Sequence, residues 1–445
     1  MIEAIEREAL TDIWPLNTTR NERGELLLGG VSASTIARDY GTPTYVYDAT
    51  TLRTTAQRFR EAFTTAYPKS RVVYAGKAFL TTALVGILRD EGLGLDVVSG
   101  GELYLGLAAG MPPHEISLHG NNKSRQELTE AIAAGIGKIV VDNEHEIDVL
   151  AELTRGRDTP MTVLLRLNPG VDVHTHEKIS TGMSDSKFGL PIVNGQAAHA
   201  VARIAAIPTL HLAGYHAHVG SQLFDPQATL DAIDELLTFA TEMRAQYGVE
   251  LGHLSPGGGF GIAYETSDHP LALESWAQTI GQAVRTGCAA RGLPLPTLTV
   301  EPGRAIVGPA GVALYEVGSS KPLPGIRTYV SVDGGMADNI RPTLYDARYS
   351  AALANRLAPP DEGEQTVTIA GKFCESGDIL IENIALPDLH LGDLLAIPAA
   401  GAYCLAMASN YNFALKPAVV LIENGIHRLI RRRETYADLL RLDLP

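Results

Sequence analysis

The stretch RVVYAGKAFLTTALVGILRDEGLGLDVVSGGELYLGLAAG (71–110) indicates the fold class. An apolar run at 71–79 is followed by an amphipathic stretch at 80–92, and the same order repeats at 94–100 and 101–110. Short runs rich in Val, Ile and Leu are typical of buried strands, and the stretches between them have helical spacing. This alternation predicts parallel strands connected by helices.

The same rhythm extends in both directions from this stretch. Further apolar runs occur at 116–122, 138–143, 163–170, 212–220, 253–261 and 296–304. About eight strands with helical patterns between most of them suit a closed (β/α)8 TIM-like barrel. We expect this α/β barrel to span 48–310.

The pattern changes after about residue 311. Runs at 311–320, 327–335, 366–374, 394–403 and 418–425 look like strands with few helices between them. Two early segments, 26–30 and 43–48, also look extended. We therefore predict a second, mostly β domain formed by 1–47 and 311–445.

Composition limits the partners and the compartment. The formal net charge is −15, with 45% hydrophobic and 20% charged residues, which disfavours a nucleic-acid or anionic-membrane surface. The N-terminus lacks signal-peptide features, and no apolar run reaches membrane-spanning length. Three cysteines, Cys288, Cys374 and Cys404, form no disulfide framework or metal-ligand spacing. A cytoplasmic protein without a metal site is expected.

Polar residues and glycines follow the predicted strands. The carboxyl ends of barrel strands share one rim, where active sites of such barrels lie. Any one of these residues could simply terminate a strand, but a series with a lysine, a histidine and a glutamate favours a shared site. The series is Lys77, Ser99, Asn121, Asn168, His218, Gly258 and Glu301.

Lys77 ends the apolar run VVYAGKAF. An amine among apolar neighbours has a lowered pKa, as Schiff-base chemistry requires. A solvent-facing lysine is the structural alternative. Lys187 in DSKFG is a competing candidate, but the apolar strand before Lys77 favours Lys77.

The segment SPGGGFG (255–261) has three successive glycines. Backbone N–H groups at Gly258 and Gly259 can approach a phosphate closely, although the nucleotide P-loop pattern is missing. In HAHVGSQ, the His218 ring could stack on a flat cofactor and the Ser221 hydroxyl could bind its phosphate. A core histidine bonded to backbone explains His218 equally well.

Two further motifs carry charged groups. In EPGR, Glu301 could keep a pyridine nitrogen protonated, and Arg304 could bind a carboxylate or phosphate. A buried ion pair between these two residues is the alternative. In CESGD, the Cys374 thiol could donate a proton to a carbanion and Glu375 could bind an ammonium group, but the segment could equally be a plain turn.

Together these motifs resemble the diaminopimelate decarboxylase family of alanine-racemase-like, fold-type III pyridoxal-phosphate enzymes. The resemblance covers nearly the whole chain, from YVYD (45–48) to SNYN (409–412). Its most specific segments are HGNNKS (119–124), HTHEKISTGMSDSKFG (174–189), DGGMADNIRPTLYDARY (333–349) and CESGD (374–378).

The resemblance implies decarboxylation of meso-2,6-diaminopimelate to L-lysine, the last step of lysine biosynthesis, by a homodimer whose active sites are shared across the interface. It assigns roles in binding the cofactor pyridoxal 5'-phosphate to Lys77 (covalent), His218 (ring stacking), Glu301 (pyridine nitrogen), and Ser221, Gly258, Gly259 and Tyr403 (phosphate). It assigns substrate roles to Arg304, Arg341 and Tyr345 (distal carboxylate, near Tyr403), Glu375 (distal ammonium) and Cys374 (proton donor to the α-carbon).

One departure and several rival functions remain. Many family members have Gly-Pro ahead of CESGD, whereas this chain has GKFCESGD, with Lys372 after the glycine. The rivals are a decarboxylase of the same fold acting on ornithine, carboxynorspermidine or carrier-bound glutamate, an amino-acid racemase, and a non-catalytic pyridoxal-phosphate-binding regulator. Two arginines suit a distal carboxylate better than a diamine precursor, and no second base for racemisation is evident.

Overall fold

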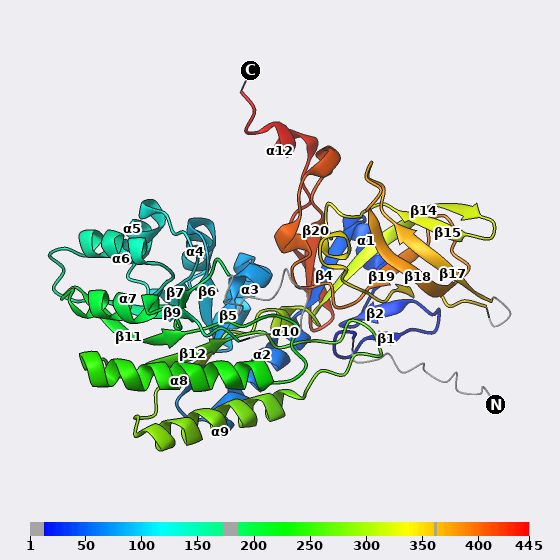
Figure 1. Cartoon of the computed structure of the whole chain (residues 1–445). Coiled ribbons are helices and arrows are strands. Elements are labelled where there is room, and N and C mark those ends of the chain that lie inside the picture. Colours follow the sequence, from blue (N-terminus) through cyan, green and yellow to red (C-terminus); the bar gives the residue numbers. More distant parts are fainter. Residues whose placement is uncertain (1–12, 172–185, 360–362, 445) are drawn as a thin grey trace. The chain divides into compact units, whose positions relative to one another are not determined.

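The computed structural model describes residues 13–171, 186–359 and 363–444. The chain divides into two compact units (Figure 1). The barrel unit comprises Thr55–Gly261 and Pro270–Gly303, and the β unit comprises Met1–Thr54, Ile262–His269 and Arg304–Pro445.

Eight parallel strands close the barrel unit. Each strand pairs with the next along the chain, and the last pairs with the first. They are β5 (Ser70–Ala75), β6 (Gly94–Val97), β7 (Ile116–Leu118), β8 (Lys138–Val141), β9 (Met161–Asn168), β11 (Leu210–His216), β12 (His253–Gly257) and β13 (Thr297–Val300). A two-residue strand, β10 (Leu190–Pro191), adds to β9. The predicted (β/α)8 barrel is confirmed.

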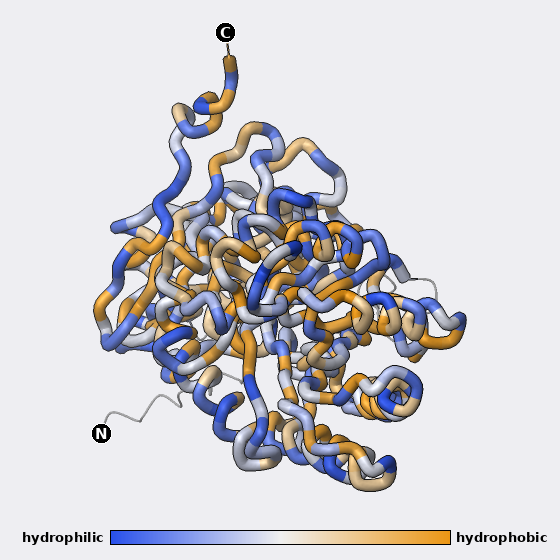
Figure 2. Tube along the Cα trace, turned by 90° about the vertical axis from the view of Figure 1, so that its left-hand side faces the viewer, coloured by the Kyte–Doolittle hydropathy of each residue, from blue (hydrophilic) through white to orange (hydrophobic). Residues whose placement is uncertain are grey.

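Helices cover the outside of the barrel (Figure 1). They are α3 (Thr82–Asp90), α4 (Gly100–Ala108), α5 (Arg125–Ala134), α6 (Glu144–Leu153), α7 (Gln196–Ala205), α8 (Gln227–Tyr247) and α9 (Leu273–Arg291). Hydrophobic and hydrophilic residues alternate along the outer helices (Figure 2), and α8 buries Ile233, Leu236 and Leu237. Such a one-sided apolar stripe is what fixes a helix against a sheet.

Several of these helices are capped at their N-termini by polar side chains that follow the preceding strand. Thr81, Ser99, Ser124 and Asn143 each accept a hydrogen bond from a backbone N–H in the first turn of α3, α4, α5 and α6. Such caps satisfy donors that the helix itself leaves unpaired. Ser99 is therefore the N-cap of α4 at the rim.

The β unit is built on a sheet of mixed direction. Its strand order is β18-β17-β15-β14-β4-β20-β21, with β19 also paired to β14. The bounds are β4 (Thr44–Asp48), β14 (Gly311–Leu323), β15 (Arg327–Val332), β16 (Ala352–Leu353), β17 (Glu364–Ala370), β18 (Ile379–Pro387), β19 (Leu394–Ile397), β20 (Ala418–Glu423) and β21 (Ile426–Arg431). The predicted mostly β second domain is confirmed, with the N-terminal strand β4 between β14 and β20.

Smaller elements complete the β unit. They are β1 (Thr19–Arg20), β2 (Leu26–Leu28), β3 (Val31–Ser32), α1 (Ala33–Tyr40), α10 (Arg304–Val307), α11 (Arg341–Tyr345) and α12 (Tyr436–Leu440), while α2 (Ala49–Ala66) runs from this unit into the barrel unit. One core cluster of the β unit joins Leu26 of β2, Ile36 of α1, Val46 of β4, Leu314 of β14 and Ile422 of β20. In the part of the chain that the structure describes, no helix is long and apolar enough to cross a membrane.

Candidate active site

The structure places the strand-end residues at one rim of the barrel unit. Asn168 is the last residue of β9, Gly258 and Glu301 directly follow β12 and β13, and His218 lies two residues after β11. Parallel strands around one barrel end on the same side, so these groups share the rim at which barrel enzymes hold their substrates.

Lys77 lies in a single 3-10 turn, Gly76–Ala78, that directly follows β5. Gly76 and Ala78 are buried, whereas the side chain of Lys77 is exposed. The expectation of an amine enclosed by apolar neighbours is therefore wrong for the chain alone. The strand ends at Ala75, and the turn leaves the lysine exposed at the rim, where its charge acts on His218 and Asp96.

Glu301 is held by two neighbouring strands. His216 Nε2 lies 2.9 Å from its Oε2, and the Ser255 hydroxyl donates to its Oε1 at 2.6 Å. Burial disfavours the carboxylate charge, but the attraction of His216 and these hydrogen bonds outweigh it, so the pKa of Glu301 falls well below its usual value. Glu301 is therefore a buried, ionised carboxylate with acceptor capacity left on both oxygens.

A second histidine–carboxylate pair lies beside the first. His119 Nε2 is 3.2 Å from Asp96 Oδ1, and the His119 and His216 rings meet edge to face at 5.0 Å. Burial lowers the pKa of His119 to about 4. Burial and the charge of Glu301 raise the pKa of Asp96. The negative charge of this network is thus concentrated on Glu301.

The same histidines bear on the expectation that the protein has no metal site. Ligand atoms of His119, His216 and Glu301 lie within 4.8 Å of one another, close enough to hold an ion. The rings already bond Asp96 and Glu301, which is sufficient to explain their placement.

His218 and the glycine segment meet at the rim. The Gly258 N–H donates to His218 Nδ1 at 3.3 Å, and burial together with the charge of Lys77 lowers the pKa of His218 well below its usual value. The ring is thus neutral. A Cβ on Gly258 would lie 2.2 Å from the Glu301 carbonyl oxygen, and Gly259 has a φ of +101°, so only glycines allow this close approach.

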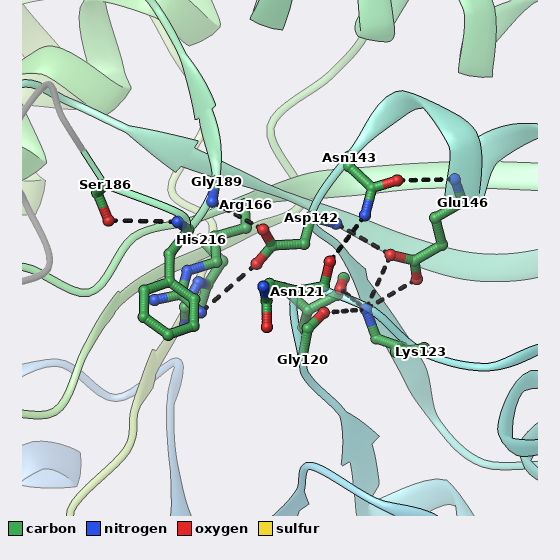
Figure 3. Close-up of polar contacts among 12 residues, drawn as sticks. Gly120, Asn121, Lys123, Asp142, Asn143, Glu146, Arg166, Ser186, Gly189 and His216 are labelled. Carbon is green, nitrogen blue, oxygen red and sulfur yellow. Dashed lines mark hydrogen bonds and ion pairs between the residues drawn. The ribbon is translucent and has the colours of Figure 1, made fainter.

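A polar lock joins the loops after β7 and β8 (Figure 3). The ammonium of Lys123 bonds Glu146 at 2.8 Å and the carbonyl oxygens of Gly120 and Val140 at 2.8 and 2.6 Å. The Lys123 and Glu146 side chains are 1% and 3% exposed. Such a buried pair fixes two loops of the rim relative to each other.

A second contact of Figure 3 holds the loop after β9. Asp142 accepts from the Gly189 N–H at 2.8 Å and lies 3.6 Å from an Arg166 nitrogen. The Arg166 guanidinium lies over the Phe188 ring at 4.5 Å. Phe188 and Gly189 end the HTHEKISTGMSDSKFG motif, of which residues 174–185 lie outside the described residues. The competing Lys187 is exposed beside Phe188.

In the β unit, Arg341 is a buried cation surrounded by tyrosines. Its guanidinium lies 4.8 Å from the Tyr264 ring centre and 5.4 Å from that of Tyr349, and it donates to the Tyr349 hydroxyl. It is 5% exposed, and among the described residues no carboxylate lies within ion-pair distance of it. Its positive charge is therefore not neutralised by any carboxylate in the part of the chain that the structure describes.

Arg304 belongs to the same tyrosine cluster. Its guanidinium donates to the Tyr264 hydroxyl and lies 4.9 Å from the centre of the Tyr403 ring. Tyr403 has a φ of +62°, a backbone conformation that a bulky residue adopts only when its surroundings impose it. Two of the predicted site residues, Arg304 and Arg341, thus meet at Tyr264, and a third, Tyr403, contacts Arg304.

The other predicted residues of the β unit are more open. Tyr345 ends α11 and is partly buried, whereas Cys374 and Glu375 are exposed. Asp378 fixes their turn by accepting from the Phe373 and Met336 N–H groups at 2.7 and 2.6 Å. The thiol and the carboxylate therefore stand on an ordered turn that faces outward in the single chain.

Comparison with known proteins identifies the family. Residues 52–308 match the family described as pyridoxal-dependent decarboxylase, pyridoxal binding domain. The diaminopimelate decarboxylase of Bacillus subtilis (strain 168) is 48% identical over 426 residues, which cover 96% of this chain and 97% of that protein. The chain belongs to the diaminopimelate decarboxylase family.

Solved structures of the family agree with the fold. A diaminopimelate decarboxylase from M. jannaschii in complex with L-lysine is 33% identical, with a TM-score of 0.89 over 96% of this chain and 98% of that one. The Helicobacter pylori enzyme complexed with L-lysine is 30% identical, with a TM-score of 0.84 over 92% of this chain and 98% of that one. The predicted family, the pyridoxal-phosphate cofactor and the class of decarboxylase are confirmed.

Sequence reasoning missed several residues that contact the predicted site residues. His216 and Ser255 hold Glu301, and Tyr264 and Tyr349 hold the two arginines. The double histidine in HAH (216–218) and the terminal tyrosine of DARY (346–349) were visible in the sequence. Nothing in the sequence showed which partners the fold would bring to them.

Proposed function

We propose that the protein is a pyridoxal-phosphate-dependent carboxy-lyase that converts meso-2,6-diaminopimelate to L-lysine and CO2, the last step of lysine biosynthesis. The observation that carries the substrate assignment is the Arg341 guanidinium, buried against tyrosine rings with no ion-paired carboxylate among the described residues. A buried cation is costly, so an uncompensated one fits a site that receives an anionic ligand.

The rim of the barrel unit has the groups that pyridoxal phosphate needs. Lys77 stands exposed at the rim to carry the cofactor, and Glu301 is an ionised carboxylate suited to the pyridine nitrogen. Neutral His218 offers an uncharged flat ring for stacking. The Ser221 hydroxyl and the N–H groups of Gly258 and Gly259, together with Tyr403, are assigned to the phosphate.

Bound pyridoxal phosphate supplies an electron sink for the pair left behind when the bond to the carboxylate breaks. The chain's own part is to orient the bond that breaks and to keep Glu301 charged. His216 and Ser255 do the latter, because they hold both carboxylate oxygens in place. Cys374 is assigned to return a proton to the α-carbon.

The distal end of meso-diaminopimelate is a second amino-acid head. Arg304 and Arg341, with Tyr345, are assigned to its carboxylate, and Glu375 to its ammonium. A guanidinium matches a carboxylate in bidentate geometry, which a diamine precursor such as ornithine cannot use. This disfavours the rival decarboxylases of ornithine or carboxynorspermidine, and the cofactor residues disfavour a non-catalytic regulator.

We further propose a homodimer with shared active sites, in the cytoplasm. Cys374 and Glu375 have catalytic and binding roles under this proposal, yet face outward in the single chain. In a homodimer, this ordered turn extends into the active site of the second copy, where both residues contact the substrate. Three free cysteines, one of them exposed, suit a reducing compartment.

The test is CO2 release by the cofactor-loaded protein. We expect turnover of meso-diaminopimelate and little turnover of L-lysine, L-ornithine or L-arginine. Lys77→Ala should abolish both turnover and the absorbance of the bound cofactor, whereas Lys187→Ala should keep both. Turnover of another amino acid only would contradict the substrate assignment, and no turnover with no cofactor absorbance would favour the regulator.

A further inference from the structure

Tyr264 and Tyr349 lie between the two arginines and are assigned no role by the proposed function. Both are buried, at 6% and 2% exposure, and their rings meet edge to face with centres 5.3 Å apart. Tyr264 takes part on both sides, since Arg304 and Arg341 lie 5.8 and 4.8 Å from its ring centre. The four side chains form one cluster, called here the tyrosine–arginine cluster.

The hydrogen bonds of this cluster follow one another from donor to acceptor, starting at Arg341. Arg341 donates to the Tyr349 oxygen, so the Tyr349 proton is left for the Cys404 sulfur at 3.3 Å. The Cys404 thiol in turn lies 3.6 Å from the Ala402 carbonyl oxygen. Burial raises the pKa of Tyr349 and that of Cys404, so both stay protonated and neutral. This series of hydrogen bonds, from Arg341 to the Ala402 carbonyl oxygen, orients the guanidinium without neutralising its charge.

The use of tyrosines has a chemical consequence for recognition. A carboxylate partner would fix an arginine equally well, but it would cancel the charge and compete with an anionic ligand. A ring face and a phenol hydroxyl stabilise the buried cation by weaker, uncharged contacts. The planar guanidinium then keeps its full charge and a fixed orientation for a planar carboxylate.

We propose that Tyr264 and Tyr349 are positioning residues that orient Arg304 and Arg341 for the carboxylate at the far end of the substrate, and so set the preference for amino acids that carry it. This inference rests on the proposed function, in which those arginines bind that carboxylate. The tyrosines act through the arginines and take no part in breaking the bond.

The experiment compares two ligands that differ only in this carboxylate. L-lysine has it, and cadaverine is the same diamine without it. Tyr349→Phe removes one hydroxyl and keeps the ring on Arg341, and Tyr264→Phe does the same beside Arg304. Tyr67→Phe is the matched control, because its buried hydroxyl donates to the Pro296 carbonyl oxygen in the barrel unit. Binding to the cofactor-loaded protein is measured by calorimetry, alongside steady-state kinetics.

For Tyr349→Phe we expect the dissociation constant of L-lysine to rise about tenfold or more, as loss of a hydrogen bond to a charged group does. The constant for cadaverine and the cofactor absorbance should stay unchanged. KM for meso-diaminopimelate should rise with kcat nearly constant, and Tyr264→Phe should show the same selectivity. Tyr67→Phe should leave both ligands unaffected.

Equal weakening of both ligands would overturn the inference, since it would show a merely structural role. Unchanged L-lysine binding in both tyrosine variants would overturn it as well. Wild-type turnover of meso-diaminopimelate reports separately on the proposed function. A selective loss of L-lysine binding without such turnover would reject the reaction and keep the carboxylate role of the tyrosines.

Discussion

Two buried cations of the barrel unit are paired with carboxylates, whereas the buried Arg341 of the β unit lies against tyrosine rings. Lys123 bonds Glu146 and Arg166 lies near Asp142, so these charges are balanced within the chain. Arg341 instead contacts Tyr264 and Tyr349. Balanced pairs fix a scaffold, while an unbalanced cation keeps its charge for a ligand.

The largest effect on stability is expected where a balanced pair is broken. Lys123→Met leaves Glu146 buried without its cation, which costs about 3–5 kcal/mol in the free energy of unfolding. Denaturant unfolding of the cofactor-loaded protein measures this. Arg125→Met is the control, because Arg125 and Glu152 are 57% and 55% exposed and such surface pairs contribute about 0–1 kcal/mol. A loss for Lys123→Met as small as the control's would show that the lock does not stabilise the rim.

The next effect concerns the charge that the barrel unit keeps at its rim. Glu301→Gln preserves the size of the side chain and removes the charge held by His216 and Ser255. We expect kcat to fall roughly 10²- to 10³-fold with the cofactor still bound, a typical loss for one preorganised electrostatic group. Glu144→Gln, on the surface beside His199, should keep full activity. A Glu301→Gln enzyme with normal kcat would exclude an electrostatic role for this carboxylate.

A third effect is a pH dependence of stability in the same network. His119 has a pKa of about 4 in the folded protein, below its ordinary 6.5, because burial disfavours its charge. Between these values the unfolded chain binds a proton that the folded chain does not. The contribution of His119 to the free energy of unfolding is therefore fully present above pH 6.5. As the pH falls to 4, the free energy of unfolding decreases by about 3 kcal/mol because of this group.

Unfolding at pH 7 and at pH 4.5 tests this pH dependence. The loss of stability on acidification should be smaller in His119→Gln than in the wild type, and unchanged in His114→Gln, whose side chain is 76% exposed. An identical loss in His119→Gln and the wild type would mean that His119 is not kept neutral by burial.

The sequence was informative where the signal is local. Apolar runs alternating with amphipathic stretches predicted the barrel, because each strand and each helix carries its own periodicity. Two of the longer strands of the β unit, β18 and β21, were not predicted. In β18 the run is interrupted by Glu382 and by Asn383, which has a φ of +52°. Most of β21 is exposed, and half of its residues are His or Arg.

The site was predicted only in part, since its partners are distant in the chain. The candidates Glu301, Arg304 and Arg341 were recognisable by type and motif, but Tyr264 and Tyr349 were not, because their contacts with arginines arise only from folding. The exposure of Lys77 was also hidden, as it depends on where strand β5 ends.

The most direct test of the difference between the two regions is one substitution made in both. Lys123→Met and Arg341→Met each remove a buried cation, and unfolding free energy and turnover of meso-diaminopimelate are measured for both. If Arg341 binds a substrate carboxylate, the free energy of unfolding of Arg341→Met should be at least as large as that of the wild type. Its kcat/KM should fall about 100-fold or more, as expected for the loss of a buried charge contact. Lys123→Met should show the large loss of stability. A loss of stability in Arg341→Met equal to that of Lys123→Met, with kcat/KM retained, would contradict the carboxylate role of Arg341.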